Sequence, residues 1–218
     1  MGESEERERG AESTVRSVGL TRRQLVEGAA GVCALAILGG GSVAFAGEGE
    51  LMRPPGAQDS SLLIGACIRC DRCRSACPRG VIDVATIEDG LINVRTPKMN
   101  FVLGYCDECA GEYRCIKACP TSALASFDKH TDKIGIAVVD TDRCVAYGVS
   151  ALCKYECITV CPEHALSKDD EGRLLLDEQA CWGCGMCQYA CLSNAYGSYD
   201  GSARRGVNIE MYRGDARV

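Results

Sequence analysis

The chain has 218 residues, enough for one or two small domains, and its formal net charge is −6. That charge argues against nucleic acid as a partner, because phosphate binding needs basic patches. Hydrophobic residues make up 46% of the chain, but 17 residues are cysteines, three are Phe and one is Trp. With so little other apolar material, we expect bound metal to form much of the interior and the apoprotein to fold poorly.

Residues 1–46 have the pattern of a twin-arginine signal peptide. A charged stretch ends in Thr21-Arg22-Arg23-Gln24-Leu25, and an uncharged run from Gly28 ends in Ala44-Phe45-Ala46, a cleavage signal. Because this route exports folded proteins, a cofactor inserted in the cytoplasm would survive export. We therefore expect the protein in the periplasm or at the extracytoplasmic face of the membrane. An uncleaved anchor is the alternative, since the run is nearly long enough to span a bilayer.

Sixteen cysteines form four quartets within a predicted four-cluster domain, residues 62–196. The remaining cysteine, Cys33, lies in the signal, and we interpret it as a small hydrophobic residue rather than a ligand. The first and fourth quartets follow C-x2-C-x2-C-x3-C, the bacterial ferredoxin spacing for a cubane cluster. Three quartets end in Cys-Pro. The predicted ligands are Cys67, Cys70, Cys73 and Cys77; Cys106, Cys109, Cys115 and Cys119; Cys144, Cys153, Cys157 and Cys161; and Cys181, Cys184, Cys187 and Cys191.

Four soft thiolates hold one [4Fe–4S] cluster, so sixteen ligands predict four such clusters. Gly183 and Gly185 are placed to let backbone N–H groups approach cluster sulfurs. The wider gaps of the second and third quartets are either surface loops where a partner docks or tolerated surface variation. Disulfides and structural zinc are the competing interpretations, but neither is typical of this repeated spacing.

The quartets begin at Cys67, Cys106, Cys144 and Cys181, which indicates one structural unit used four times. Strand-like runs lie between them, at 92–94 after Glu88-Asp89-Gly90, at 134–139, and at 174–176 after Asp170-Glu171-Gly172. We predict an α+β fold with two tandem ferredoxin-like dicluster units, rich in loops and braced by short antiparallel hairpins around four cubane clusters.

The segments that flank the four-cluster domain are polar. Residues 47–61 form a lead-in that contains Arg53-Pro54-Pro55-Gly56, and residues 197–218 form a tail, which we interpret as a disordered end rather than a docking segment. His130 and His164 have no metal-ligand partner at useful spacing, so we expect both on the surface.

The pattern resembles the NapG/MauM type of exported ferredoxin-type protein. The resemblance covers the twin-arginine leader, the Arg53-Pro54-Pro55-Gly56-Ala57 lead-in, the order of the quartets, the strand from Gly135 to Val139, and Ala180-Cys181-x-Gly-Cys184-Gly. It implies pairing with a polytopic membrane ferredoxin, a quinol dehydrogenase subunit, and electron delivery to a downstream extracytoplasmic redox enzyme. The spacing of the third quartet departs from the family pattern.

The sequence contains no nucleotide-binding glycine fingerprint and no nucleophile–base motif, which favours an electron-transfer subunit without catalytic residues. The alternative is the iron–sulfur subunit of a molybdopterin oxidoreductase, and a third hypothesis is a non-redox protein held by zinc or disulfides. By analogy with the sixteen-cysteine subunits, we expect the first quartet to exchange its fourth ligand with the last, and the second with the third. Sequential pairing is the alternative.

Overall fold

Four short helices, each carrying the third cysteine of one quartet, organise the fold. The computed structural model describes residues 50–147, 153–193 and 204–212, all within one compact unit, Phe45–Val218. The predicted signal, with its arginine pair and Cys33, lies outside the described residues. Within the described residues, no helix has the length and apolar character needed to cross a membrane.

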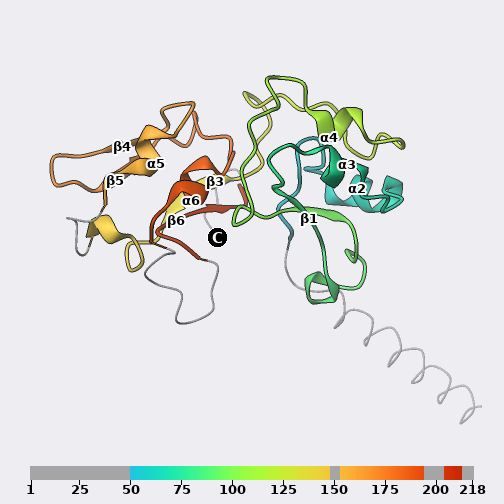
Figure 1. Cartoon of the computed structure of the whole chain (residues 1–218), viewed down its shortest axis with the longest axis horizontal. Coiled ribbons are helices and arrows are strands. Elements are labelled where there is room, and N and C mark those ends of the chain that lie inside the picture. Colours follow the sequence, from blue (N-terminus) through green and yellow to red (C-terminus); the bar gives the residue numbers. More distant parts are fainter. Residues whose placement is uncertain (1–49, 148–152, 194–203, 213–218) are drawn as a thin grey trace, which may run out of the picture. The chain divides into compact units, whose positions relative to one another are not determined.

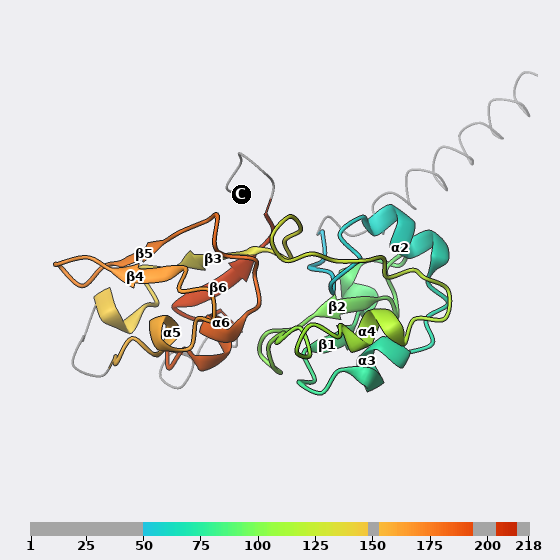
Figure 2. The same ribbon diagram turned by 90° about the horizontal axis from the view of Figure 1, so that it is seen from above.

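The described elements are short, and loops connect them (Figures 1 and 2). The helices are α2 (Ser60–Ala66), α3 (Arg72–Ala76), α4 (Arg114–Lys117), α5 (Glu156–Thr159) and α6 (Met186–Ala190), with 3-10 turns η1 (Ile87–Asp89) and η2 (Val145–Tyr147). The strands are β1 (Ile82–Val84), β2 (Pro97–Met99), β3 (Ile136–Val139), β4 (Leu166–Lys168), β5 (Leu174–Leu176) and β6 (Val207–Glu210).

The strands form three antiparallel pairs. β1 pairs with β2, with Ile82 opposite Met99, and β4 pairs with β5, with Leu166 opposite Leu176. The third pair joins β3 to β6, with Val139 opposite Val207. The small sheets and long loops fit the predicted ferredoxin-like fold, and the predicted strands at 134–139 and 174–176 are confirmed in β3 and β5.

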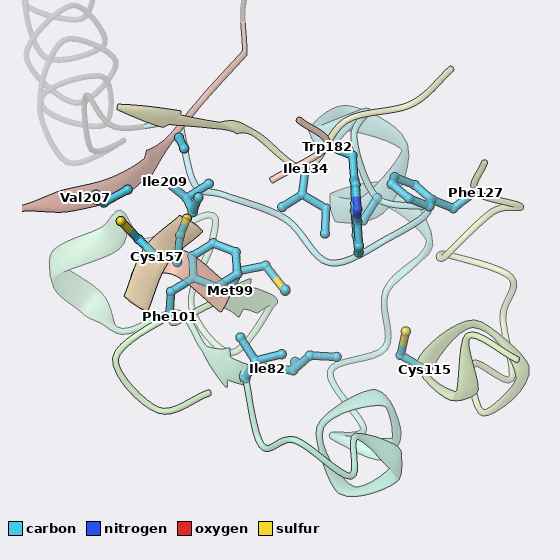
Figure 3. Close-up of a cluster of buried hydrophobic side chains, with 14 of the residues drawn as sticks. Ile82, Met99, Phe101, Cys115, Phe127, Ile134, Cys157, Trp182, Val207 and Ile209 are labelled. Atoms are coloured by element: carbon cyan, nitrogen blue, oxygen red, sulfur yellow. The ribbon is translucent and has the colours of Figure 1, made fainter. Parts of the chain in front are cut away.

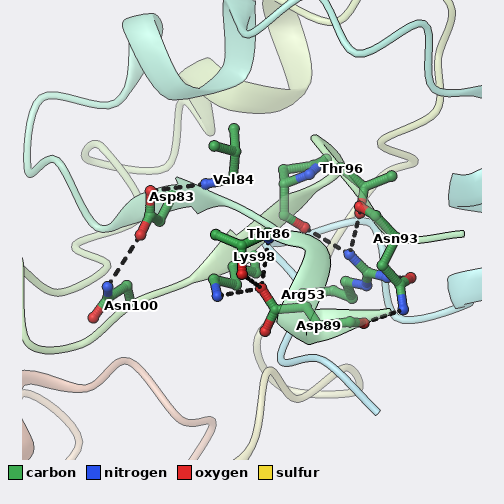
Figure 4. Close-up of polar contacts among 10 residues, drawn as sticks. Arg53, Asp83, Val84, Thr86, Asp89, Asn93, Thr96, Lys98 and Asn100 are labelled. Carbon is green, nitrogen blue, oxygen red and sulfur yellow. Dashed lines mark hydrogen bonds and ion pairs between the residues drawn. The ribbon is translucent and has the colours of Figure 1, made fainter. Parts of the chain in front are cut away.

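The strand predicted at 92–94 is wrong, because these residues lie in turns and the partner of β1 is β2. A polar network holds the connection as a longer loop (Figure 4). Asn93 Nδ2 donates to the Asp89 carbonyl oxygen at 2.9 Å, and Asp89 Oδ2 accepts from the Thr86 backbone N–H at 2.7 Å. Glu88 and Asp89 therefore lie within η1 and Gly90 is its C-cap, so this segment does not form a tight hairpin turn.

Part of the lead-in, which we predicted to be polar, lies in the interior of the protein. Arg53 is 4% exposed, and Pro54 and Pro55 are fully buried. The Arg53 guanidinium donates to Thr96 Oγ1 and the Pro97 carbonyl oxygen, both at 2.9 Å, and to Asn93 Oδ1 at 2.6 Å. The lead-in thus joins the β1–β2 connection to the interior, and these bonds repay the burial of a charge.

The predicted disordered end is also wrong for residues 204–212. Val207 and Ile209 alternate along β6 and are buried, at 1% and 6% exposure. Arg205 is buried as well, and its guanidinium donates to the Gln188 and Tyr189 carbonyl oxygens at the end of α6, at 2.6 and 2.5 Å. The tail therefore braces the helix of the fourth quartet. Both histidines are exposed, as predicted.

Candidate metal centres

The sixteen predicted ligands line four separate cavities, with four cysteines at each. The spaces measure about 450, 330, 470 and 340 Å³ for A to D, counting the open water at their mouths. We name them by their cysteines: cavity A (Cys67, Cys70, Cys73, Cys119), cavity B (Cys77, Cys106, Cys109, Cys115), cavity C (Cys144, Cys153, Cys157, Cys191) and cavity D (Cys161, Cys181, Cys184, Cys187).

Each cavity takes three cysteines from one quartet and the fourth cysteine of a neighbouring quartet. Cys77 of the first quartet lies in cavity B, and Cys119 of the second lies in cavity A. Cys161 and Cys191 are exchanged between cavities C and D in the same way. The nested pairing that we expected is therefore wrong, and the pairing is sequential.

The packing of the short helices explains the sequential exchange. α3 packs against α4, and α5 packs against α6. In each helix the second residue is the third cysteine of its quartet, and the fourth cysteine follows within two residues of the helix end. Because paired helices lie side by side, the chain that leaves one helix reaches the cavity of the other. The third quartet obeys this rule despite its unusual spacing.

The loops before the helices present backbone N–H groups to the cysteine sulfurs. Arg69 and Tyr155 donate to Cys67 Sγ and Cys153 Sγ, both at 3.4 Å. Their φ angles are +56° and +55°, in the left-handed region that costs a non-glycine residue about 1–2 kcal/mol. Gly183 occupies the matching position, and its N–H contacts Cys181 Sγ. Successive N–H groups turned inward in this way make an anion-binding concavity, which suits an anionic cluster.

Burial dominates the electrostatics of the thiols. Desolvation raises the pKa of Cys73 to about 11, and those of Cys115, Cys157 and Cys184 to about 12, so each cavity contains at least one such thiol. Desolvation also acts on Cys119, but backbone N–H groups led by Leu124 outweigh it, so the pKa of that thiol is lowered. Ligand thiols must be deprotonated, so these buried groups need the positive charge of bound iron.

The donor set fits iron–sulfur clusters. None of the sixteen described cysteines forms a disulfide. Among the described residues, no three His, Cys, Asp or Glu side chains converge closely enough to hold a single metal ion. The thiols instead surround spaces lined mostly by apolar side chains. Trp182 lines cavity D at 2% exposure, and its Nε1–H has no acceptor among the described residues (Figure 3). A cluster sulfur would supply one.

Cavities B and D are linked directly through their ligands. The Cys106 N–H donates to the Cys184 carbonyl oxygen at 2.8 Å. Beside this bond Gly185 has a φ of +81°, and a Cβ there would lie 1.9 Å from the Phe101 ring. Lys129 Nζ also joins Glu108 and Glu163, at 2.8 and 2.7 Å. The cavities therefore follow one another in the order A, B, D and C.

Sequence reasoning missed the support that the C-terminal strand gives to this site. The Gly206 N–H donates to Ser193 Oγ, and a Cβ on Gly206 would lie 2.7 Å from the Cys144 Cα. Asn208 Oδ1 accepts from the Arg205 N–H at 2.8 Å. The alternation of Val207, Asn208 and Ile209 is the signal that could have indicated a strand.

Comparison with known proteins agrees with the cysteine geometry. A family model described as a 4Fe-4S dicluster domain matches residues 151–195, and one described as a 4Fe-4S binding domain matches residues 64–80. The dicluster match spans seven of the eight cysteines of cavities C and D, so it agrees with their pairing.

Curated relatives include the ferredoxin-type protein NapG of Escherichia coli (strain K12) and that of Shigella flexneri. Each is 36% identical to this chain over 70 residues, which cover 32% of the chain. The match spans 30% of the length of each relative. The cysteine-lined cavities and these matches together show that the chain contains 4Fe-4S binding domains and is similar to the ferredoxin-type protein NapG over 32% of its length.

Proposed function

We propose that the chain holds four [4Fe–4S] clusters and relays electrons from a membrane quinol-oxidising partner to an extracytoplasmic redox enzyme. The observation that carries the proposal is the set of four cavities with four cysteines each, ordered A, B, D and C. When bound, such clusters supply one-electron redox chemistry. Cavities A and C stand at the ends of this order, so the two partners would exchange electrons there.

The chain's own residues supply the ligands and the environment. The thiolates hold iron, and backbone N–H groups such as those of Arg69 and Tyr155 hydrogen bond to the ligand sulfurs. Such bonds stabilise added negative charge, and they set the reduction potential together with burial. Buried side chains around cavity D, including Trp182 and Ile209, keep water away from the ligands.

The route by which the protein leaves the cytoplasm is part of the proposal. The arginine pair and cleavage signal of residues 1–46 support export of the folded protein by the twin-arginine system. The membrane partner would be a polytopic ferredoxin that oxidises quinol. We expected nested pairing in this chain by analogy with the sixteen-cysteine subunits of molybdopterin oxidoreductases. The sequential ligand exchange departs from that analogy, and this difference supports the quinol-oxidising partner over a molybdopterin subunit.

The first experiment is anaerobic purification from native membranes, followed by analysis of metal content and of the proteins that co-purify. We expect about sixteen iron and sixteen acid-labile sulfide per chain, since each cubane contains four of each, together with a polytopic membrane ferredoxin. A colourless, iron-free protein would overturn the cluster assignment. A large molybdopterin subunit in its place would overturn the quinol relay and leave the clusters intact.

A further inference from the structure

We propose that the surface around Cys70 is the docking site for a redox protein that presents an acidic face. This inference rests on the electron relay proposed above. The surface consists of Ile68, Arg69, Cys70, Arg72 and Arg74, all of which line cavity A. We call it the arginine surface.

The arginine surface is positively charged, whereas the chain as a whole carries a net negative charge. The net charge of the protein is −6, yet Cys67–Cys77 contains three arginines and one aspartate. That aspartate, Asp71, is already paired with a further arginine, Arg95, at 2.8 Å. By contrast, Cys106–Cys119 contains three acidic and two basic residues, and Cys181–Cys191 contains no charged residue. Positive charge is therefore concentrated at one of the four quartets.

The arginines are available to a partner. Arg69, Arg72 and Arg74 are exposed, and no ion pair joins any of them to an acidic side chain in the described part of the chain. The Arg69 guanidinium donates one hydrogen bond to the Ile92 carbonyl oxygen at 3.1 Å, and Asp83 is the acidic residue that acts on Arg74 from a distance. Beside them Ile68 is 62% exposed, so the arginine surface also offers an apolar contact. Such a combination of an apolar centre and a charged rim is typical of protein interfaces.

The position of the arginine surface indicates that its partner carries electrons. Cys70 is the one exposed cysteine of the sixteen described, and cavity A stands at one end of the cavity order. A partner that covers the arginines would bring its own redox group to the most accessible ligand of the relay. Opposite charge would steer that encounter and orient it. An anionic membrane would satisfy the charges but would bring no electron carrier to Cys70.

The test compares two charge reversals at the two ends of the cavity order. Arg72→Glu changes the arginine surface, and Lys154→Glu makes the same charge change at an exposed residue that lines cavity C. Each reduced holoprotein is mixed with tris(oxalato)cobaltate(III), a trianion, or hexaamminecobalt(III), a trication. One electron leaves the protein and reduces Co(III) to Co(II), and the rate is followed by cluster absorbance in stopped flow.

We expect Arg72→Glu to slow oxidation by the trianion by about threefold or more, and to leave or accelerate oxidation by the trication. Lys154→Glu should change the trianion rate less, and added salt should remove the difference. Arg74→Glu is the second variant, in case Arg72→Glu loses iron. If Arg72→Glu and Lys154→Glu changed the oxidation rates equally, the docking site would be overturned but the proposed relay would not. If the cobalt complexes could not oxidise the holoprotein, the proposed relay itself would be overturned.

Lipid vesicles test the alternative that an anionic membrane, rather than a protein, binds the arginine surface. Holoprotein is sedimented with phosphatidylglycerol vesicles and with phosphatidylcholine vesicles. Suppose that the holoprotein binds the anionic vesicles, that Arg72→Glu abolishes this binding, and that the rate of oxidation by the cobalt complexes does not depend on charge. These results would assign the arginine surface to the membrane and overturn the proposal. Absence of binding together with the expected rate changes would support a protein partner.

Discussion

At the scale of single residues, Trp182 connects packing to redox properties. Its indole ring packs against Phe127, with ring centroids 6.2 Å apart, and the residue lines cavity D. Its buried Nε1–H has no acceptor among the described residues. An unpaired buried donor costs about 1–3 kcal/mol, so the folded protein needs an acceptor there. A cluster sulfur can be that acceptor, and the bond would strengthen when the cluster gains an electron.

We therefore expect Trp182→Phe to lower the reduction potential of one cluster. The shift should be about 20–60 mV, since a net hydrogen bond contributes about 0.5–1.5 kcal/mol and 59 mV corresponds to about 1.4 kcal/mol for one electron. EPR-monitored redox titration measures it. Phe127→Leu, which alters the aromatic contact and keeps the indole, is the control. Unchanged potentials in Trp182→Phe would show that the N–H has another acceptor.

A single ligand substitution tests the sequential pairing. Cys77→Ser should disturb the same cluster as Cys106→Ser, because both cysteines line cavity B. The EPR spectra of the two variants should lose the same component and retain the signals of cavities C and D. If Cys77→Ser instead reproduced the spectrum of Cys184→Ser, the first quartet would share its ligand with the fourth, and the pairing seen in the structure would be wrong.

At the scale of elements, β6 is a structural part of the second pair of cavities. Arg205 holds the C-terminal carbonyls of α6, and the Gln188 side chain accepts from the Ile209 N–H at 2.7 Å. A cation at the C-terminal end of a helix also interacts favourably with its dipole. These contacts explain how a strand outside the four quartets supports the ligands of the third and fourth quartets.

Arg205→Ala should destabilise the holoprotein by about 1–3 kcal/mol, because it leaves buried carbonyls without their donor. The clusters of cavities C and D should be lost at lower temperature than those of A and B, as followed by EPR after anaerobic heating. Arg204→Ala removes a neighbouring guanidinium, which is exposed and paired with Glu210 at 2.8 Å. That control should cost less than about 1 kcal/mol. Equal losses in the two variants would contradict the bracing role.

The sequence predicted that these sixteen cysteines gather in sets of four, and it predicted the β4–β5 hairpin, because both depend on local spacing. Ligand pairing did not follow from spacing, since every quartet ends in the same way and packing between helices decides the partner. The β3–β6 pair was missed because its strands lie far apart in the chain. The lead-in around Arg53 appeared polar by composition. Its burial, and the hydrogen bonds from Arg53 to three acceptors, show that it belongs to the interior.

At the scale of the whole molecule, the junction between cavities B and D would decide whether the two pairs of cavities work as the single relay that we propose. Gly185→Ala should destabilise this junction, because the left-handed φ costs about 1–2 kcal/mol and overlap with Phe101 adds about 1–3 kcal/mol. Gly80→Ala is a matched control, with a φ of +64° and open space around the added Cβ. Anaerobic thermal unfolding should show the larger loss for Gly185→Ala; equal losses would mean that Phe101 yields without cost.

The exposure of Cys70 also determines how the protein would fail in air. An opening that admits an electron carrier also admits dioxygen. Oxidative damage should therefore begin at cavity A, which contains Cys70, the one exposed cysteine among the described residues. Cys119 and Cys77 tie cavities A and B to each other, so damage at one releases a ligand of the other. Aerated protein should therefore pass through a form that keeps about half of its iron, held at C and D. Because the ligands are exchanged between two cavities, the two clusters of a pair should be lost together rather than one at a time.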